Sequence, residues 1–501
     1  MLNDWIEGFM SLLGWEEVFF LCVGMAVGLA MGVLPGVGGS TALILLMPIT
    51  LALEPSEALA LAGGLFGSNT IGGAITAILL NTPGTTSNAI TCLDGYPLAQ
   101  QGKAGYAIGA AASSNALGGL LGMVSVLVLI PISSSMILAF GPPEFFALAV
   151  VGLVFVALTA RGNLVRALIM TCAGAAVGTI GYSDVTGAER YVFGSEYLWE
   201  GMKLPVIVIG LYALAEMAHL TVKGGTVAKA DAPRAMTGLW DGIMASFKYW
   251  GAVVRGSIIG TIVGVLPGIG GAVAALLSYT STQQADKDPS SYGKGNVKGV
   301  IAPEAAMTAK DGGMLIPTLA FGIPGGAEMA IFMGILVLHG IQPGPLMLLN
   351  HSVEIYSLAW AITASCVLTS IVGIAIARPI ASLARVNVQL LAPIITAIAV
   401  IGAYAIDLEI MNVVVAAAFG LFGYLLIKHK MQRISFLIAV LLGNIAERNF
   451  HQSMMMSHDG PLIFLTRPVC LTIILALIAA VVLMNLRGLR APRAGKPAAV
   501  S

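Results

Sequence analysis

An eight-residue phrase whose chemistry suits an anion site inside a membrane occurs twice in this chain. It reads GVLPGVGG at 32–39 and GVLPGIGG at 264–271, and the two copies differ at one position. Proline removes a backbone donor and breaks a helix, whereas glycine allows unusual dihedral angles and close approach of the backbone. The freed N–H groups, together with the positive end of the half-helix that follows, favour a carboxylate.

Each copy is followed by a second Pro-Gly turn, and these turns add polar side chains. The first turn, in NTPGTTSNAIT, begins at Asn81 and continues with hydroxyl and amide residues through Asn88. The second, in FGIPGGAEMA, has Glu328 as its nearest acid. Oxygens of this kind beside free backbone carbonyls are suitable ligands for a dehydrated sodium ion.

The candidate site residues come from these four segments. Ser40 and Thr41 follow the first phrase where Ala272 and Val273 follow the second, so the halves are not chemically equivalent. The alternative is that the glycines serve helix packing and the polar side chains cap local backbone. The predicted substrate-binding residues are Pro35, Gly36, Gly38, Gly39, Ser40, Thr41, Asn81, Thr82, Pro83, Gly84, Thr85, Thr86, Pro267, Gly268, Gly270, Gly271, Gly322, Pro324, Gly325 and Gly326. The predicted ion-binding residues are Ser68, Asn69, Asn88 and Glu328.

Acidic residues inside apolar sequence are further candidates, because a buried charge in a membrane protein usually has a function. Glu304 and Asp311 are expected in a loop-like stretch before the second Pro-Gly turn. Thr70 follows two of the predicted ion-binding residues and is expected near the same cavity.

The composition assigns the chain to the helical membrane proteins. It has 501 residues, 57% hydrophobic and 10% charged, with a mean hydropathy of +0.91. Soluble domains carry about 25% charged residues, and lipid leaves backbone groups to be satisfied inside helices. The net charge is zero and no basic tract is interleaved with aromatics, so no nucleic acid is expected as a partner. Five scattered cysteines suggest neither a disulfide framework nor a resident metal.

The charges predict an orientation, because lysine and arginine in short loops mark the cytoplasmic side. The acidic N-terminus is expected outside, and the basic loop 221–255 and the C-terminal tail inside. Roughly 11 to 13 spans of about 20 residues are expected. Predicted helices cover 104–131, 137–158, 163–182, 204–220, 356–377, 386–406, 411–427, 434–450 and 461–486.

The same charges predict two repeats of opposite direction. The segment 94–105 must lie inside and the segment 339–347 outside for the following helices to reach their loops. Inverted repeats with broken or re-entrant helices are the common device for alternating access to one central site. The predicted division is a first repeat half at 1–220 (motifs at 32–41 and 81–88), a cytoplasmic linker at 221–255, a second half at 256–486 (motifs at 264–271 and 322–328) and a cytoplasmic tail at 487–501.

Several motifs together resemble the large membrane subunit of the tripartite tricarboxylate transporter family (TctA type). They are the repeated LPG-x-GG, NTPG, DGYPLA, APEAA at 302–306, GIPG and HG-x-QPGPL, and the resemblance spans roughly residues 15 to 470. It implies a multi-pass permease of the bacterial inner membrane, for which the charges predict a periplasmic N-terminus and a cytoplasmic C-terminus. It also implies a small membrane subunit and a periplasmic solute-binding protein as partners, and di- or tricarboxylates as substrates.

The resemblance implies coupling to an ion gradient, sodium or proton, with no cofactor and no enzymatic activity. The chain has no Gly-x4-Gly-Lys-Ser/Thr phosphate loop, which agrees with this. Departures flank the expected site, at Tyr279–Pro289, Lys298, Met307 and Thr308, so the particular carboxylate stays open.

Three readings of the function compete. The first is a symporter that depends on a binding protein, and the second is an ion-coupled carrier that works alone. The third is a channel or a membrane-embedded enzyme; the scattered histidines argue against an enzyme, and inverted halves argue against a pore. The oligomeric state, a dimer included, stays open.

Overall fold

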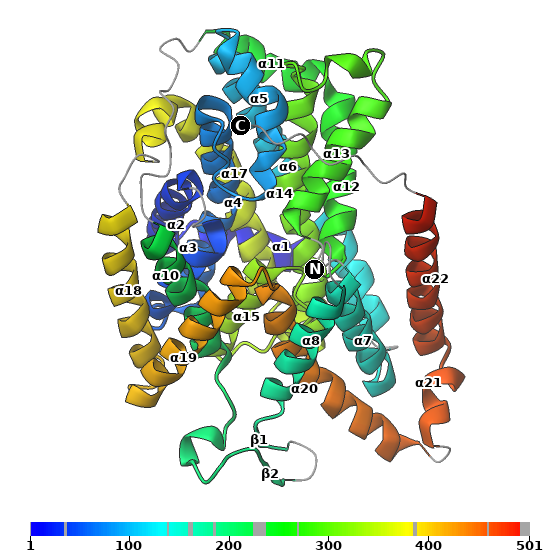
Figure 1. The fold of residues 1–501 in the computed structure, drawn as a ribbon. Helices are drawn as coiled ribbons and strands as arrows, with labels where there is room; N and C mark the ends of the chain where they lie inside the picture. The colour runs from blue at the N-terminus through cyan, green and yellow to red at the C-terminus, as the bar shows by residue number, and fades with distance from the viewer. Residues whose placement is uncertain are drawn as a thin grey trace.

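The computed structural model describes residues 2–34, 38–137, 140–158, 164–183, 187–223, 237–267, 270–383, 388–457 and 460–490. In these ranges the chain is almost wholly helical, as the sequence predicts, and forms a polytopic bundle (Figure 1). One small hairpin, β1 (Gly181–Tyr182) with β2 (Glu189–Arg190), projects from its lower end in this view.

The helices fall into two series that follow the two copies of the repeated phrase. The first series is α1 (Leu2–Leu12), α2 (Trp15–Val33), α3 (Gly38–Thr50), α4 (Pro55–Leu80), α5 (Thr91–Gln100), α6 (Ala104–Ile137), α7 (Pro142–Leu158), α8 (Leu164–Gly178), α9 (Leu204–Val208) and α10 (Ala215–Lys223). The second is α11 (Leu239–Lys248), α12 (Trp250–Val265), α13 (Gly271–Gln284), α14 (Lys298–Phe321), α15 (Ala327–Leu338), α16 (Pro345–Asn350), α17 (Ser352–Leu383), α18 (Val388–Ala405), α19 (Ile410–Lys428), α20 (Arg433–Met456), α21 (Ile463–Thr466) and α22 (Pro468–Arg490).

The predicted helices are present, with three differences in detail. The helix expected at 163–182 ends at Gly178, and the helix expected at 204–220 contains a π-helical stretch, Ile209–Leu214. The helix expected at 461–486 is broken before Pro468, and its two parts are bent by 79°. In the described residues six helices are long and apolar enough to span a membrane, or seven with the bent pair, and six apolar helices are shorter. The predicted number of 11 to 13 spans is therefore reached only if most of the shorter apolar helices also enter the membrane.

Glycines at every fourth position bring α2 onto α4 and α12 onto α14. A side chain at Gly28 would overlap the backbone of Leu65, and one at Gly260 would overlap the backbone of Ala306. Glycine lets membrane helices approach this closely. The same contacts recur one turn before and one turn after each of these positions, at Gly24, Gly32, Gly256 and Gly264.

One long helix of each series packs on the central helix of the other series. The first-half helix α6 packs on α14, where Gly118 meets Ala305. The second-half helix α17 packs on α4, where Gly63 meets Ala361. Both central helices, α4 and α14, are consequently buried along nearly their whole length.

Contacts at the ends of α6 and α17 show that the series run in opposite directions. The start of α6 lies beside the segment that leads into α11, where Tyr106 N donates to Thr237 O at 2.9 Å. Phe140, which lies between the end of α6 and the start of α7, contacts Phe321 at the end of α14, with ring centroids 5.4 Å apart.

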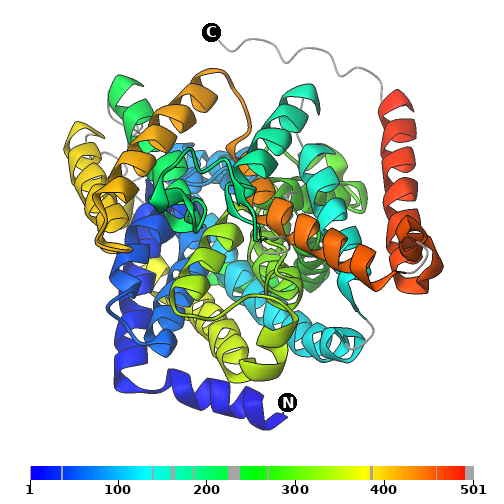
Figure 2. The ribbon, with the colours of Figure 1, turned by 90° about the horizontal axis from the view of Figure 1, so that it is seen from below.

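The end of α14 also adjoins the segment that leads into α17. Gly344, just before α16, donates to Leu319 O at 3.0 Å, and α17 begins beside α1, where Ser352 Oγ donates to Asp4 Oδ2 at 2.8 Å. Thus α6 begins at the α11 end of the bundle and α17 begins at the opposite end. In Figure 1 the α11 end is uppermost and α1 lies below it, about half-way down the molecule; in Figure 2 α1 lies at the lower edge of the view.

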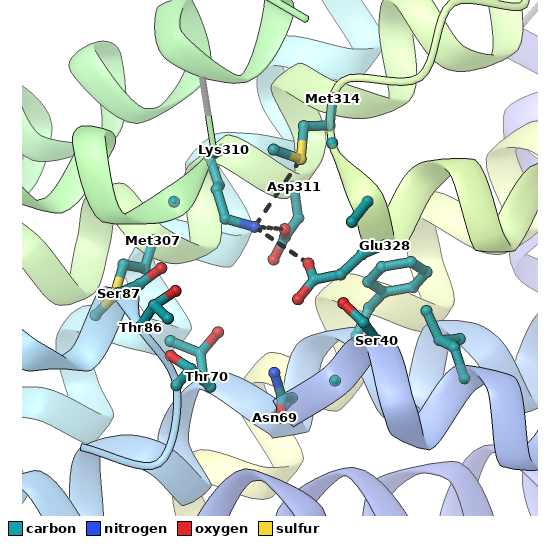
Figure 3. Close-up of a pocket in the computed structure, with 18 of the residues that line it drawn as sticks. Ser40, Asn69, Thr70, Thr86, Ser87, Met307, Lys310, Asp311, Met314 and Glu328 are labelled. Carbon is teal, nitrogen blue, oxygen red and sulfur yellow. Dashed lines mark hydrogen bonds and ion pairs between the residues drawn. The ribbon is translucent and has the colours of Figure 1, made fainter. Parts of the chain in front are cut away.

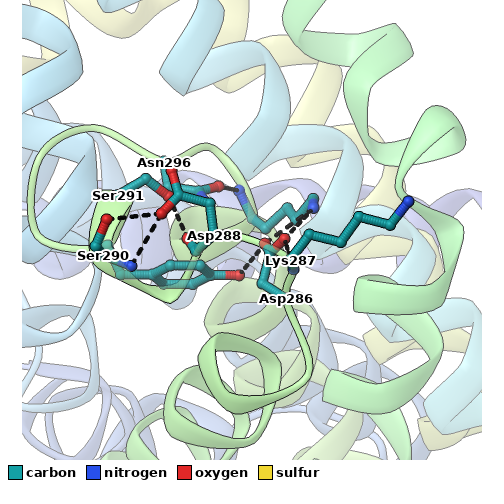
Figure 4. A network of polar contacts seen from close by, with 8 residues as sticks. Asp286, Lys287, Asp288, Ser290, Ser291 and Asn296 are labelled. Atoms are coloured by element: carbon teal, nitrogen blue, oxygen red, sulfur yellow. Dashed lines mark hydrogen bonds and ion pairs between the residues drawn. The ribbon is translucent and has the colours of Figure 1, made fainter.

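A polar network closes the loop between α13 and α14 at the α11 end (Figure 4). Lys298 Nζ lies 2.9 Å from both carboxylate oxygens of Asp286, and Tyr292 donates to the same carboxylate at 2.9 Å. Burial alone would raise the pKa of Asp286, but these hydrogen bonds outweigh it and lower the pKa to about 2. The buried Asp94 of α5 ties the loop to the first half, because it accepts from Gly295 N and Asn296 N, each at 2.8 Å.

We expect Gly260→Leu to destabilise the bundle by about 1–3 kcal/mol or more, because the added side chain has no space against α14. Gly251→Leu, in the same helix, is the matched control, since nothing lies within 4 Å of a side chain there. Thermal unfolding of the purified variants in detergent measures both. Equal stability of the two variants would contradict the close approach.

We expect Asp286→Asn to lower the melting temperature at pH 7 but to differ less from the wild type at pH 3. The folded pKa lies below the usual value of 3.8, so the stabilisation is complete above that value and is lost as the pH falls through about 2. The exposed neighbour Asp288→Asn is the control. A deficit in Asp286→Asn that is independent of pH would refute the ion pair.

Candidate functional site

A polar cavity of about 180 Å³ lies where the broken segments of the two halves meet (Figure 3). Three helices begin at it, α3, α13 and α15, each after one of the glycine-rich turns. Their N-terminal N–H groups and the positive ends of their dipoles favour an anion in the cavity. The lining residues are Gly39, Ser40, Leu43, Leu65, Phe66, Asn69, Thr70, Thr85, Thr86, Ser87, Gly270, Gly271, Met307, Lys310, Asp311, Met314, Gly326, Ala327, Glu328 and Ile434.

The cavity is built from corresponding elements of the two halves. Gly39 of the first phrase faces Asn69 of its own half and Glu328 of the other half. The corresponding glycine of the second phrase, Gly271, faces Lys310 of its own half and Ser87 of the other. Each of these two glycines therefore lies between one residue of its own half and one residue of the other half. This is expected of a site that two repeats related by a two-fold axis form together.

The helix packing fixes which residues of α4 and α14 correspond. Gly32 lies against Asn69, and its counterpart Gly264 lies against Lys310. The neutral pair Asn69–Thr70 in the first half thus takes the place that the charged pair Lys310–Asp311 takes in the second. This agrees with the prediction that the two halves differ chemically.

The Pro-Gly turns also correspond. Both α4 and α14 end in a left-handed residue, Asn81 with φ 52° and Gly322 with φ 69°. The glycines that follow, Gly84 and Gly325, lie against the carbonyl groups of Gly32 and Gly264. The turns therefore dock each long helix against the broken helix of its own half.

Three charged groups lie at the second-half wall. Lys310 Nζ is 2.5 Å from Asp311 Oδ1 and 3.6 Å from Glu328 Oε2. Lys310 and Asp311 are 7% and 2% exposed, respectively. With their ordinary charges, these groups sum to one negative charge, which the three helix N-termini partly offset. The other polar side chains that line the cavity are neutral: Ser40, Asn69, Thr70, Thr85, Thr86 and Ser87.

Nine of the predicted site residues line the cavity: Gly39, Ser40, Asn69, Thr85, Thr86, Gly270, Gly271, Gly326 and Glu328. The other described ones lie in the supporting turns and helices around it: Gly38, Thr41, Ser68, Asn81, Thr82, Pro83, Gly84, Asn88, Pro267, Gly322, Pro324 and Gly325. Ser68, for example, donates to Gly64 O in its own helix. Pro35, Gly36 and Gly268 lie outside the described residues.

The expectation that Glu304 and Asp311 lie in a loop is wrong. Both belong to the continuous helix α14, which contains Pro303 and Pro317 without ending at either. Prolines and paired glycines can remain in a membrane helix when its neighbours satisfy the freed groups. The sequence prediction does not include Lys310, although a lysine within a membrane helix is itself a functional signal.

We expect Lys310→Gln to destabilise the protein by about 3–5 kcal/mol, because Asp311 is left as an unpaired buried charge. Lys310→Gln with Asp311→Asn should recover most of that loss, since the double variant removes both charges. Thermal unfolding in detergent compares the two variants. A double variant no more stable than Lys310→Gln would show that the two side chains are not coupled.

The chain matches a known protein family and is similar to proteins of Agrobacterium vitis. Residues 18–438 match the model of a family described as the tripartite tricarboxylate transporter TctA family. An uncharacterized 52.8 kDa protein in the TAR-I ttuC' 3' region of Agrobacterium vitis is 32% identical over 497 residues, 98% of each chain. An uncharacterized protein in the TAR-II ttuC' 3' region of the same organism is 29% identical over 238 residues, 47% of this chain and 97% of that protein. No solved structure matches.

Proposed function

Because the chain belongs to the tripartite tricarboxylate transporter TctA family, we propose that it is the permease subunit of an importer of di- or tricarboxylates. The family is one of transporters and not of enzymes. One observation supports the proposal above the others: the polar cavity lies between corresponding elements of two inverted halves. If the halves exchange conformations, the same cavity opens to opposite faces of the membrane.

In this proposal the substrate carboxylates bind at the start of α3, α13 and α15. Backbone N–H groups at helix N-termini bind oxyanions well, and Ser40, Thr86 and Ser87 add hydroxyl donors. Lys310 supplies a positive charge, next to Asp311. The narrow cavity and its buried walls favour a compact, polar anion.

The charge of the cavity supports coupling to a cation gradient. Lys310 is already paired with Asp311, and Glu328 adds a further negative charge. A substrate with two or three carboxylates would therefore enter unfavourably unless a cation, or a proton on one of the acids, enters with it. We propose sodium or proton symport on this ground.

The family supports dependence on partner proteins. We propose that the chain lies in the bacterial inner membrane, where a small membrane subunit completes the permease. We also propose that a periplasmic solute-binding protein delivers the substrate to this permease. The N-terminus is proposed to be periplasmic and the C-terminal tail cytoplasmic, in line with the charge of the loops.

Uptake of labelled succinate, malate and citrate into proteoliposomes tests the proposal. The chain is reconstituted with its small partner subunit, and the binding protein, sodium gradient and pH gradient are varied one at a time. We expect accumulation above equilibrium that requires the binding protein. Accumulation without it would favour a carrier that works alone, and equilibration without accumulation would favour a channel.

We expect Thr86→Val to raise the KM for uptake by about ten- to a hundredfold, because a hydrogen bond to a charged ligand contributes about 1.5–3 kcal/mol. Thr472→Val is the control, since Thr472 is exposed on α22 and donates within its own helix. Equal KM values for the two variants would remove Thr86 from the binding site.

A further inference from the structure

A fully buried acid lies just behind the cavity and has an oxygen without a partner. Glu304 of α14 is 0% exposed. Its Oε1 accepts from Thr91 Oγ1 at 2.5 Å and from Asn88 Nδ2 at 3.3 Å. Its Oε2 has no hydrogen-bond partner among the described residues. One carboxyl oxygen thus accepts two hydrogen bonds, while the other accepts none from the described residues.

This arrangement is that of a neutral carboxylic acid. In a protonated carboxyl group the carbonyl oxygen accepts hydrogen bonds and the other oxygen carries the proton. An ionised carboxylate would share its charge with an oxygen that nothing compensates, at a cost of several kcal/mol in a buried site. In the described part of the chain no basic side chain is bonded to Glu304. The described titratable groups on α14 and on the helices packed against it are Glu57 of α4, Cys92, Asp94 and Tyr96 of α5, Tyr106 of α6, Arg255 of α12, Tyr279 of α13, Glu328 of α15, Glu354, Tyr356 and Cys366 of α17, and Lys298, Lys310 and Asp311 of α14 itself.

A chain of hydrogen bonds connects Glu304 to the cavity and crosses between the halves. Asn88, which donates to Glu304, also donates to Thr70 O at 3.3 Å. Thr85 Oγ1 donates to Asn88 Oδ1 at 2.5 Å. Thr70 and Thr85 both line the cavity. A movement of the NTPG turn relative to α14 would therefore change the surroundings of Glu304 and of a bound substrate together.

We infer that Glu304 is a proton-binding site, protonated in this closed arrangement and able to release its proton when the contact between the halves opens. This rests on the proposed function in assigning the proton to symport. The O–H bond forms on Oε2 by uptake of a proton from water on one side and breaks by release to water on the other. A sodium ion fits less well, because a sodium ion needs several oxygen ligands, whereas Oε2 has no hydrogen-bond partner among the described residues and Oε1 already accepts from Thr91 and Asn88.

The protonation itself can be tested without a substrate. Infrared spectra of the purified chain at neutral pH should contain the absorption of a protonated carboxyl group that Glu304→Gln lacks. Glu57→Gln is the matched control, because Glu57 is 8% exposed and caps α4, a role that glutamine can fill. The control should keep the absorption. Identical absorption in the wild type and Glu304→Gln would overturn the inference, whatever the chain transports.

The role in coupling is tested in proteoliposomes with the complete system. We expect Glu304→Gln, which mimics the protonated acid, to lose accumulation driven by a pH gradient but to keep exchange of labelled for unlabelled carboxylate. Retained exchange shows that the variant is folded. Wild-type accumulation driven by sodium alone, or undiminished pH-driven accumulation in Glu304→Gln, would overturn the role. Failure of the wild type to transport any carboxylate would instead count against the proposed function.

A second variant acts on the same group through its donor. Thr91→Val removes the stronger hydrogen bond to Glu304, and that bond favours the ionised form. The alkaline limb of the pH profile for uptake should therefore shift to higher pH. A shift to lower pH, or none, would contradict the assignment.

Discussion

The structure depends on how closely the backbones of α2 and α12 approach those of α4 and α14. Glycine at every fourth position removes the side chains that would separate each pair. This contact sets the rotation of α4 and α14 about their axes, and so determines that Asn69 and Lys310 face the broken helices. The glycine-rich turns then have a fixed surface on which to dock. The position of the cavity therefore depends first on how the helix backbones pack, and the polar side chains then determine its chemistry.

Much of this arrangement could be predicted from the sequence because the repeat is unusually faithful. The repeated phrase and the paired Pro-Gly turns located both broken segments, and the charges of the loops gave the opposite directions of the two series. These are strong local signals, carried by proline, glycine and the bias of basic residues. The repeated phrase and the Pro-Gly turns can each be recognised from one short segment of sequence, whereas the directions of the two series require the charges of several loops.

The second-half wall could not be predicted, because it depends on a helix that looks interrupted. The stretch before the second Pro-Gly turn contains Pro303, Pro317 and the Gly312–Gly313 pair, yet α14 is continuous and buried along nearly its whole length. A loop prediction for this stretch gives no reason to single out Lys310. The pairing of Glu304 with Asn88 and Thr91 joins residues more than 200 positions apart, and a distance of that kind has no local signature in one sequence.

Ser87 and Glu328 occupy corresponding positions after the two Pro-Gly turns, and each lies against the glycine of the opposite phrase. In the alternating-access carrier proposed above, two identical halves would make the inward-facing and outward-facing states equal in energy. A hydroxyl at one of these positions and a carboxylate at the other would give the two states different electrostatic energies. The empty carrier would then have a preferred resting side, which a perfectly duplicated chain would lack.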